Sequence, residues 1–139
     1  MKIKNFAMLA GVAAILAACG GSSKVTEPAD LNDQRVFFAF NSSEISDEAR
    51  TNLLGQSLYM KNHEDVKIQI AGNCDERGST EYNLALGARR ANAAKRVLVK
   101  DGIDAGRIST ISYGKERPLV KGTGEEVWKY NRNATTTVK

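Results

Sequence analysis

The pattern that most restricts the fold of this chain is an alternation of short apolar runs with longer stretches of helical periodicity. Residues 36–40 are apolar and aromatic, which is typical of a buried strand. Residues 66–70 alternate between apolar and polar side chains, as in a strand with one buried face. Residues 47–61 and 80–100 instead repeat their apolar side chains at helical spacing. These four segments predict two strand-helix units in succession.

The remainder of the chain completes one sheet. Two further strands are expected at residues 107–113 and 134–138, with a short helix at 125–131. Ser46 is predicted to cap the first long helix, and Asp101-Gly102 to end the second. The order β-α-β-α-β-β predicts an α+β fold of two layers, with the helices packed over one face of the sheet.

The first eighteen residues are not expected to belong to this fold. Lys2 and Lys4 precede an uncharged, mainly apolar run, Phe6–Ala18, and this order is typical of a signal peptide. The run is shorter than the ~20 apolar residues of a membrane span. A buried helix of a cytosolic domain is the less favoured alternative. We therefore divide the chain into a signal at 1–18, an N-terminal tether rich in Gly, Ser and Thr at 19–34, and a folded domain at 35–139.

Leu16–Gly20 resembles the lipobox of bacterial lipoprotein signals. The resemblance implies cleavage before Cys19, a diacylglyceryl group on its thiol and acylation of its new α-amine. More than one acyl chain gives stable attachment, because each buried methylene contributes ~0.8 kcal/mol. Gly20 stands where an Asp would signal retention at the inner membrane, so the resemblance places the protein on the periplasmic face of the outer membrane.

Composition argues against several functions. The chain has 20 Lys+Arg and 16 Asp+Glu, a net charge of +4 that falls to +2 without the two signal lysines. This excess is too small to indicate a nucleic-acid partner. His63 is the single histidine, so a site with two or three histidines for a metal cannot be built, and no cofactor is expected. A binding protein is favoured over an enzyme.

Arg90 interrupts an apolar line on the helix expected at 80–100. That line is formed by Leu86, Ala93, Ala94 and Val97. Arg89 lies about 100° away around the helix, nearer a polar flank. Because an arginine keeps its charge and is costly to bury unpaired, Arg90 needs an anionic partner. The partner is either an internal carboxylate, with snorkelling as a further alternative, or the carboxylate of a ligand.

The loop before this helix, Gly72–Gly78, leaves a strand end and enters a helix N-terminus, where ligand contacts are common. Asp75 in this loop could receive an ammonium group. Asp75 and Arg90 together would then clamp a zwitterionic amino-acid head group. The alternative is that Asp75 caps the helix or pairs with Arg77.

These same segments resemble the peptidoglycan-associated lipoprotein family, whose domain is of the OmpA C-terminal type. Gly72–Gly78 (GNCDERG) is similar to its GHTDERG signature, and Tyr82–Ala93 to its YNxxLGxRRANA helix. Val36–Ile45, Ser112–Pro118 and Asn131-Arg132 are similar to its VxFxFDxxxI, SYGKExP and NRRA motifs. The resemblance implies the β-α-β-α-β-β sandwich that the periodicity also predicts.

The resemblance further implies non-covalent binding of peptidoglycan through the meso-diaminopimelate of its stem peptide. The two family residues that hold this group fall on Asp75 and Arg90. Other positions that line the family's pocket fall on Phe40, Asn41, Arg77 and Leu86. The implied partners are TolB and other proteins of the Tol system, and the implied role is to tether the outer membrane to the wall, with effects on envelope integrity and cell division.

The chain departs from the family pattern at Asn41, Asn73, Cys74 and Asn133, which replace Asp, His, Thr and Arg. The loss of an acid at Asn41 affects the expected affinity. Cys74 is either a small buried residue or a site of intermolecular oxidation. Two alternative functions stay open: a peptidoglycan-modifying enzyme, and a wall-binding lipoprotein outside the Tol system.

Overall fold

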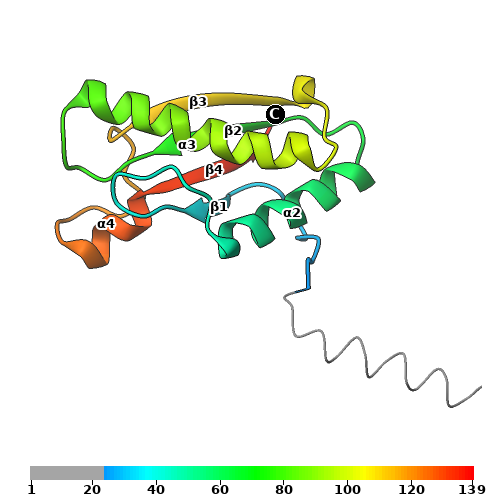
Figure 1. Ribbon diagram of the computed structural model, residues 1–139, viewed down its shortest axis with the longest axis horizontal. Coiled ribbons are helices and arrows are strands. Elements are labelled where there is room, and N and C mark those ends of the chain that lie inside the picture. The colour runs from blue at the N-terminus through cyan, green and yellow to red at the C-terminus, as the bar shows by residue number, and fades with distance from the viewer. Residues whose placement is uncertain (1–23) are drawn as a thin grey trace, which may run out of the picture.

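The computed structural model describes residues 24–139 (Figure 1). The predicted signal peptide and Cys19 lie outside the described residues. The elements in chain order are β1 (Gln34–Phe37), α2 (Asp47–Asn62), β2 (Ile68–Asn73), α3 (Thr80–Lys100), the 3₁₀ turn η1 (Ala105–Arg107), β3 (Ile108–Gly114), α4 (Glu125–Asn131) and β4 (Asn133–Val138). Within residues 24–139, no helix combines the length and the apolar character that crossing a membrane requires.

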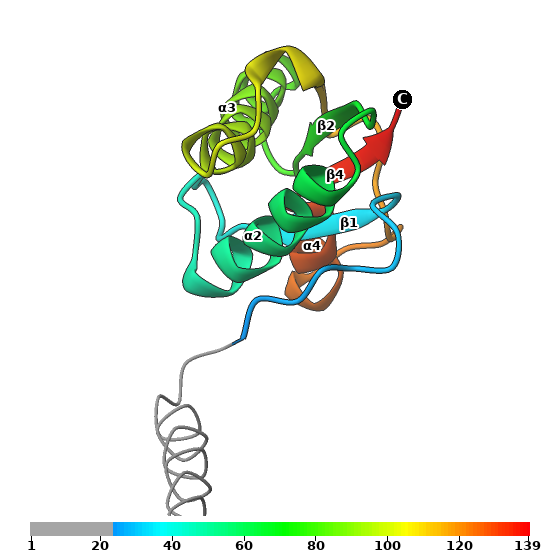
Figure 2. The same ribbon diagram turned by 90° about the vertical axis from the view of Figure 1, so that its right-hand side faces the viewer.

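The strands form one mixed sheet with the order β1-β4-β2-β3. β2 and β3 are parallel, and α3 connects them, whereas β4 runs antiparallel to both β1 and β2. Figure 2 shows α2 and α3 on the same face of the sheet, and Figure 1 places α4 near the start of β4. The predicted α+β fold of two layers is confirmed.

Both long helices begin at serine caps. The Ser46 hydroxyl accepts a hydrogen bond from the Ala49 amide at 3.1 Å, and the Ser79 hydroxyl accepts one from the Tyr82 amide at 3.0 Å. Each bond satisfies a backbone donor that has no partner inside its helix. α3 ends before Gly102, whose φ of 103° requires a glycine-like backbone. The predicted ends of α3 are therefore confirmed.

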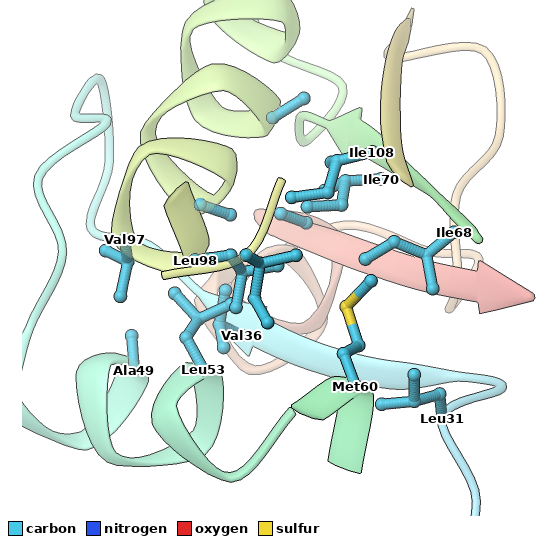
Figure 3. Close-up of a cluster of buried hydrophobic side chains, with 14 of the residues drawn as sticks. Leu31, Val36, Ala49, Leu53, Met60, Ile68, Ile70, Val97, Leu98 and Ile108 are labelled. Atoms are coloured by element: carbon cyan, nitrogen blue, oxygen red, sulfur yellow. The ribbon is translucent and has the colours of Figure 1, made fainter. Parts of the chain in front are cut away.

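The hydrophobic core lies between the sheet and the two long helices (Figure 3). Members from β2, β3, α2 and α3 include Ile68, Ile70, Ile108, Leu53, Met60, Val97 and Leu98, and Phe38 joins them from the segment after β1. Leu58, an apolar residue in the periodic segment 47–61, is instead 36% exposed. At 100° per residue it lies about 140° around α2 from Leu53, so it faces solvent.

The folded domain begins before residue 35, the boundary expected from composition. Leu31 is fully buried in the core, and the Asp33 amide donates to the Thr136 carbonyl at 2.8 Å. Glu27 accepts a hydrogen bond from Asn62 at 2.7 Å. The burial of Leu31 and the backbone hydrogen bond between Asp33 and β4 thus attach part of the expected tether to the domain.

α3 approaches the sheet most closely where two glycines meet. A Cβ atom added at Gly72 would collide with the backbone of Gly87, and one added at Gly87 would collide with the Ser112 hydroxyl and lie 2.9 Å from the Gly72 carbonyl oxygen. The absence of both side chains allows the backbones of β2 and α3 to touch. This contact sets the depth at which α3 presents its residues to the neighbouring loops.

We predict that Gly87→Ala destabilises the domain, although alanine favours helix formation. The forced separation of α3 from β2 should cost ~1–3 kcal/mol of unfolding free energy, as overpacking does elsewhere. Urea unfolding followed by circular dichroism measures the change. Ala85→Ser, at an exposed position of the same helix, is the control and should change stability by less than about 0.7 kcal/mol. Equal stability of Gly87→Ala and the parent would contradict the close contact.

Candidate functional site

A cavity of about 280 Å³ opens between the loop after β1, the loop after β2 and the first three turns of α3. The six residues expected at the site all line it: Phe40, Asn41, Asp75, Arg77, Leu86 and Arg90. Four further residues complete the lining: Cys74, Gly78, Tyr82 and Asn83. Residues that are up to fifty positions apart in the sequence therefore meet in one hollow.

The loop after β1 forms one wall. The apolar run of residues 36–40 was expected to be one strand, but β1 ends at Phe37. The chain then turns through Asn41, whose φ is 58°. Asparagine tolerates this left-handed conformation better than most residues do. The turn leaves Phe40 56% exposed at the mouth of the cavity.

Arg90 is 1% exposed and is the largest fully buried side chain among the described residues. Its guanidinium donates three hydrogen bonds, all to backbone carbonyls: Nε to Ser42 at 2.8 Å, Nη1 to Asn73 at 2.9 Å and Nη2 to Ala39 at 3.1 Å. Within residues 24–139 no carboxylate oxygen lies within 4 Å of it. Arg90 therefore joins two loops but keeps a positive charge that no described side chain balances.

The direction of the pKa shift of Arg90 agrees with a buried charge that lacks a carboxylate partner. Burial lowers the pKa of its guanidinium, and the positive charge of Arg132 acts in the same direction. Arginine nevertheless stays protonated in proteins. Of the two partners that the sequence left open, the internal carboxylate is wrong for the described residues, because backbone carbonyls occupy its place.

Asp75 is also buried, at 4% exposed, and lies between two arginines. Its Oδ1 accepts from the backbone amide and Nε of Arg77 at 3.0 and 3.2 Å, and its Oδ2 accepts from Arg77 Nη2 at 2.8 Å. Arg132 Nη1 lies 3.4 Å from the same Oδ2. Burial opposes ionisation of Asp75, but the hydrogen bonds and charge of Arg77, together with the bond from Arg132, outweigh it and lower its pKa. Pairing of Asp75 with Arg77 is thus present in this structure.

Arg132 is a second arginine that contacts the Asp75 carboxylate, and the sequence did not indicate this role. Its side chain is buried, and it donates from Nε to the Phe38 carbonyl at 2.9 Å. Its two terminal nitrogens contact Glu125 of α4 at 3.1 and 2.8 Å. The bond to Glu125 raises the pKa of Arg132 and lowers that of Glu125. Only the folded chain brings α4, β1 and the loop after β2 together.

Arg77 closes the rim of the cavity. Its guanidinium carbon lies 3.9 Å from the ring centres of both Phe40 and Trp128. Trp128 Nε1 in turn donates to Glu76 at 2.7 Å, and this bond lowers the pKa of Glu76. Arginine prefers such stacked positions because its charge is spread over a flat group. This stacking between the rings of Phe40 and Trp128 holds the Arg77 guanidinium beside Asp75.

Cys74 is buried beneath the cavity, with 3% of its surface exposed. Its Sγ donates to the Asn83 carbonyl at 3.3 Å, and burial raises its pKa. This agrees with the interpretation of Cys74 as a small buried residue. His63 is exposed at the end of α2, where it stacks on Tyr59, and it does not line the cavity of Cys74.

Among residues 24–139, the charges around the cavity leave one cation without a carboxylate partner. Asp75 and Glu125 together balance Arg77 and Arg132, because each carboxylate is bonded to at least one of these arginines. Arg90 is the remaining charge. Within residues 24–139 no group of three or more His, Cys, Asp or Glu side chains is arranged to hold a metal ion. The cavity is therefore suited to an organic group that carries a carboxylate.

We predict that Asp75 stabilises the fold in a pH-dependent way. Because its pKa is lowered in the folded chain, its contribution is fully present above about 3.9, the ordinary value, and is lost as the pH falls through the folded value. The stability difference between the parent and Asp75→Asn should be largest at pH 7 and should shrink below about pH 4. Urea unfolding at several pH values measures it. A difference that stays constant with pH would contradict the paired, ionised Asp75.

The chain is similar to known proteins in sequence and in fold. Residues 37–132 match the OmpA family model. Peptidoglycan-associated lipoproteins from Pasteurella multocida and Mesorhizobium japonicum are 39% and 46% identical to the chain, over 96% and 75% of its length. The alignments cover 96% of the former relative and 62% of the latter.

Solved structures agree. The crystal structure of the peptidoglycan-associated lipoprotein from Burkholderia pseudomallei superposes with a TM-score of 0.74 at 39% identity, covering 76% of this chain and 90% of that one. The C-terminal domain of Helicobacter pylori MotB, at 19% identity and a TM-score of 0.69, shares the fold, covering 79% of this chain and 85% of that one. The chain thus belongs to the OmpA family, as a homologue of the peptidoglycan-associated lipoproteins.

Proposed function

We propose that the cavity binds the zwitterionic side-chain end of meso-diaminopimelate in the peptidoglycan stem peptide. The observation that carries the proposal is Arg90, a buried cation without a carboxylate partner among the described residues that lines an open cavity. Membership of the OmpA family and homology to proteins named peptidoglycan-associated lipoproteins support the choice of ligand. In this proposal the ligand carboxylate supplies the counter-charge that Arg90 lacks.

The hydrogen-bonding capacity of Arg90 fits this role. A guanidinium has five N–H donors, and the backbone carbonyls occupy three of them. Two donors remain, the number that a bidentate carboxylate uses. The carbonyls of Ala39 and Ser42 also hold the group in place, so little ordering is needed when the ligand arrives.

The ammonium group of the ligand would bind beside Asp75. Since Arg77 and Arg132 already donate to both carboxylate oxygens, the ammonium must share Asp75 with Arg77 or displace it. The Arg77 side chain is about one-third exposed at the rim, so it has room to move. Phe40, Asn41 and Leu86 would contact the methylene chain and the neighbouring stem peptide. The two arms of the clamp therefore differ. The arm at Arg90 is free because two of its donors are unused, whereas the arm at Asp75 is shared with Arg77 and Arg132.

In the cell, the protein would tether the outer membrane to the wall through a lipid on Cys19, with TolB and other Tol proteins as partners in envelope integrity and cell division. The names of the relatives support the lipoprotein and wall-binding parts of this role. A wall-binding lipoprotein outside the Tol system is the alternative for the partners. A peptidoglycan-modifying enzyme is disfavoured by the raised pKa of Cys74, which opposes formation of a thiolate nucleophile.

We predict that Asp75→Ala and Arg90→Ala each weaken binding to diaminopimelate-containing sacculi by more than tenfold. Loss of one partner of a desolvated charge pair typically costs ~2–5 kcal/mol. The effect of Arg90 should be the larger, because its arm of the clamp is free, and the two losses should not add. Sedimentation of the protein with sacculi measures binding, and intact sacculi after incubation exclude hydrolysis of the wall.

Arg89→Ala is the matched control, since Arg89 is the exposed neighbour of Arg90 on the same helix. Its binding should stay close to that of the parent. Arg90→Lys keeps the charge but loses the planar donor pattern, and it separates charge from geometry if Arg90→Ala does not fold. Sacculi with lysine in place of diaminopimelate, which lack the side-chain carboxylate, should bind poorly. Parent-like binding by folded Arg90→Ala and Arg90→Lys would contradict the clamp.

A further prediction concerns the membrane anchor. We expect Cys19→Ala to move the protein from the outer-membrane fraction to the soluble periplasmic fraction, because the acyl chains on Cys19 would supply the attachment. Fractionation and immunoblotting measure the distribution, and binding of the released protein to sacculi shows that the domain is intact. Retention of Cys19→Ala in the outer-membrane fraction, in cells whose wall has been digested, would show that the lipid is not the anchor.

A further inference from the structure

A second hollow, of about 780 Å³, lies between the end of the loop after β1, the start of α2 and the C-terminal half of α3. We call it the α3 groove. Residues 43–45 and Arg50 form one side, and residues 92–100 of α3 form the other. It shares no lining residue with the cavity of Asp75 and Arg90. The two hollows are therefore separate, although both are lined by residues of the segment between β1 and α2.

The α3 groove is strongly basic. Arg50, Lys95, Arg96 and Lys100 line it, against one acid, Glu44. None of these four cations belongs to an ion pair within residues 24–139, although Lys95 donates to the backbone carbonyl of Ile108 at 3.0 Å. The groove thus concentrates positive charge that the described part of the chain does not balance.

Local helix electrostatics explains only part of this charge. Cations in the last turns of α3 interact favourably with the helix dipole, which accounts for Lys100. Arg50 follows directly on the first turn of α2, where the dipole favours acids and disfavours a cation. Its position beside the cations of α3 is not a consequence of stabilising its own helix. An anionic partner would balance both sides of the groove at once.

The groove also has apolar side chains. Val97 is buried at the edge of the core, facing Ala49 of α2, and Figure 3 shows both side chains. Ile45 is half-buried, and Val99 is 39% exposed. A hollow with apolar side chains between basic ones matches a peptide that carries both acidic and apolar residues. A phosphate group alone would leave the apolar part uncovered, and a flat membrane surface does not fill a hollow.

We propose that the α3 groove binds an acidic segment of a partner protein, in which carboxylates alternate with aliphatic side chains. The carboxylates would pair with Arg50 and Arg96 across the groove, and the aliphatic side chains would cover the exposed parts of Ile45 and Val99. Because the groove and the cavity share no lining residue, a segment in the groove would leave the cavity open. The proposal does not rest on the proposed function of the cavity.

The test uses the full chain in a mild non-ionic detergent and a fluorescein-labelled peptide, Asp-Leu-Glu-Val-Asp-Leu-Glu, with binding followed by fluorescence anisotropy at 0.15 M salt. Arg50→Glu and Arg96→Glu should each weaken binding at least tenfold. The matched control is Lys121→Glu, which changes net charge equally at an exposed position outside the groove, and it should change binding less than twofold. Circular dichroism checks that each variant is folded, and Arg50→Gln and Arg96→Gln replace any glutamate variant that is not.

Two competitors and a second peptide identify the ligand class. A peptide with serine in place of leucine and valine should bind at least tenfold more weakly. Inorganic phosphate and phosphatidylglycerol vesicles should not displace the labelled peptide at concentrations where the unlabelled peptide does. The proposal is overturned if the peptide does not bind at 0.15 M salt, if Lys121→Glu weakens binding as much as Arg96→Glu, if the serine peptide binds equally, or if vesicles or phosphate displace the peptide.

Discussion

The arrangement of the cavity depends on the buried guanidinium of Arg90. It bonds to the carbonyls of Ala39 and Ser42 in one loop and of Asn73 at the end of β2. These bonds hold the turn that carries Phe40 and Asn41 over the cavity. A lysine could not make three bonds in one plane, and an apolar residue would leave these buried carbonyls without a donor. The same side chain therefore shapes the site and supplies its uncompensated charge.

A second polar network connects α4 to the cavity through a series of hydrogen bonds. Glu125 is bonded to Arg132, Arg132 to Asp75, and Asp75 to Arg77, which is stacked between Phe40 and Trp128. The buried members, Asp75 and Arg132, are each held in one orientation, because buried donors and acceptors must be satisfied. Asp75 thus stays ionised in spite of its burial. The network also pairs Arg77 and Arg132 with carboxylates, so that in the proposed function selectivity for a carboxylate would rest on Arg90.

The comparison with a distant structure shows how little the fold depends on particular residues. The domain of Helicobacter pylori MotB shares the fold at only 19% identity, so the layered arrangement tolerates extensive change in sequence. Patterns of apolar side chains, rather than particular residues, specify such an arrangement. In this chain the charges of Arg90 and Asp75 are costly to bury, and they are placed where the fold leaves a cavity.

The sequence by itself determined the order of the helices and strands and the bounds of the long helices, because caps and apolar periodicity are local signals. The bounds of β1 and β2 differ from the predicted ones by two or three residues at each end. The bounds of α3 were predicted exactly, and those of α2 differ by one residue. Arg90 and Asp75 were also predicted from the sequence, Arg90 because a charge inside an apolar line needs a partner, and Asp75 because it lies in the loop that enters the same helix. The tertiary structure alone decided the partners of these two residues. Arg90 contacts backbone carbonyls from two segments. Asp75 contacts Arg132, which lies between α4 and β4 and is 57 residues away in the sequence. Contacts between distant segments, which no local pattern records, likewise decide three other features. These are the early end of β1, the burial of Leu31 and the ion pair of Glu125 with Arg132.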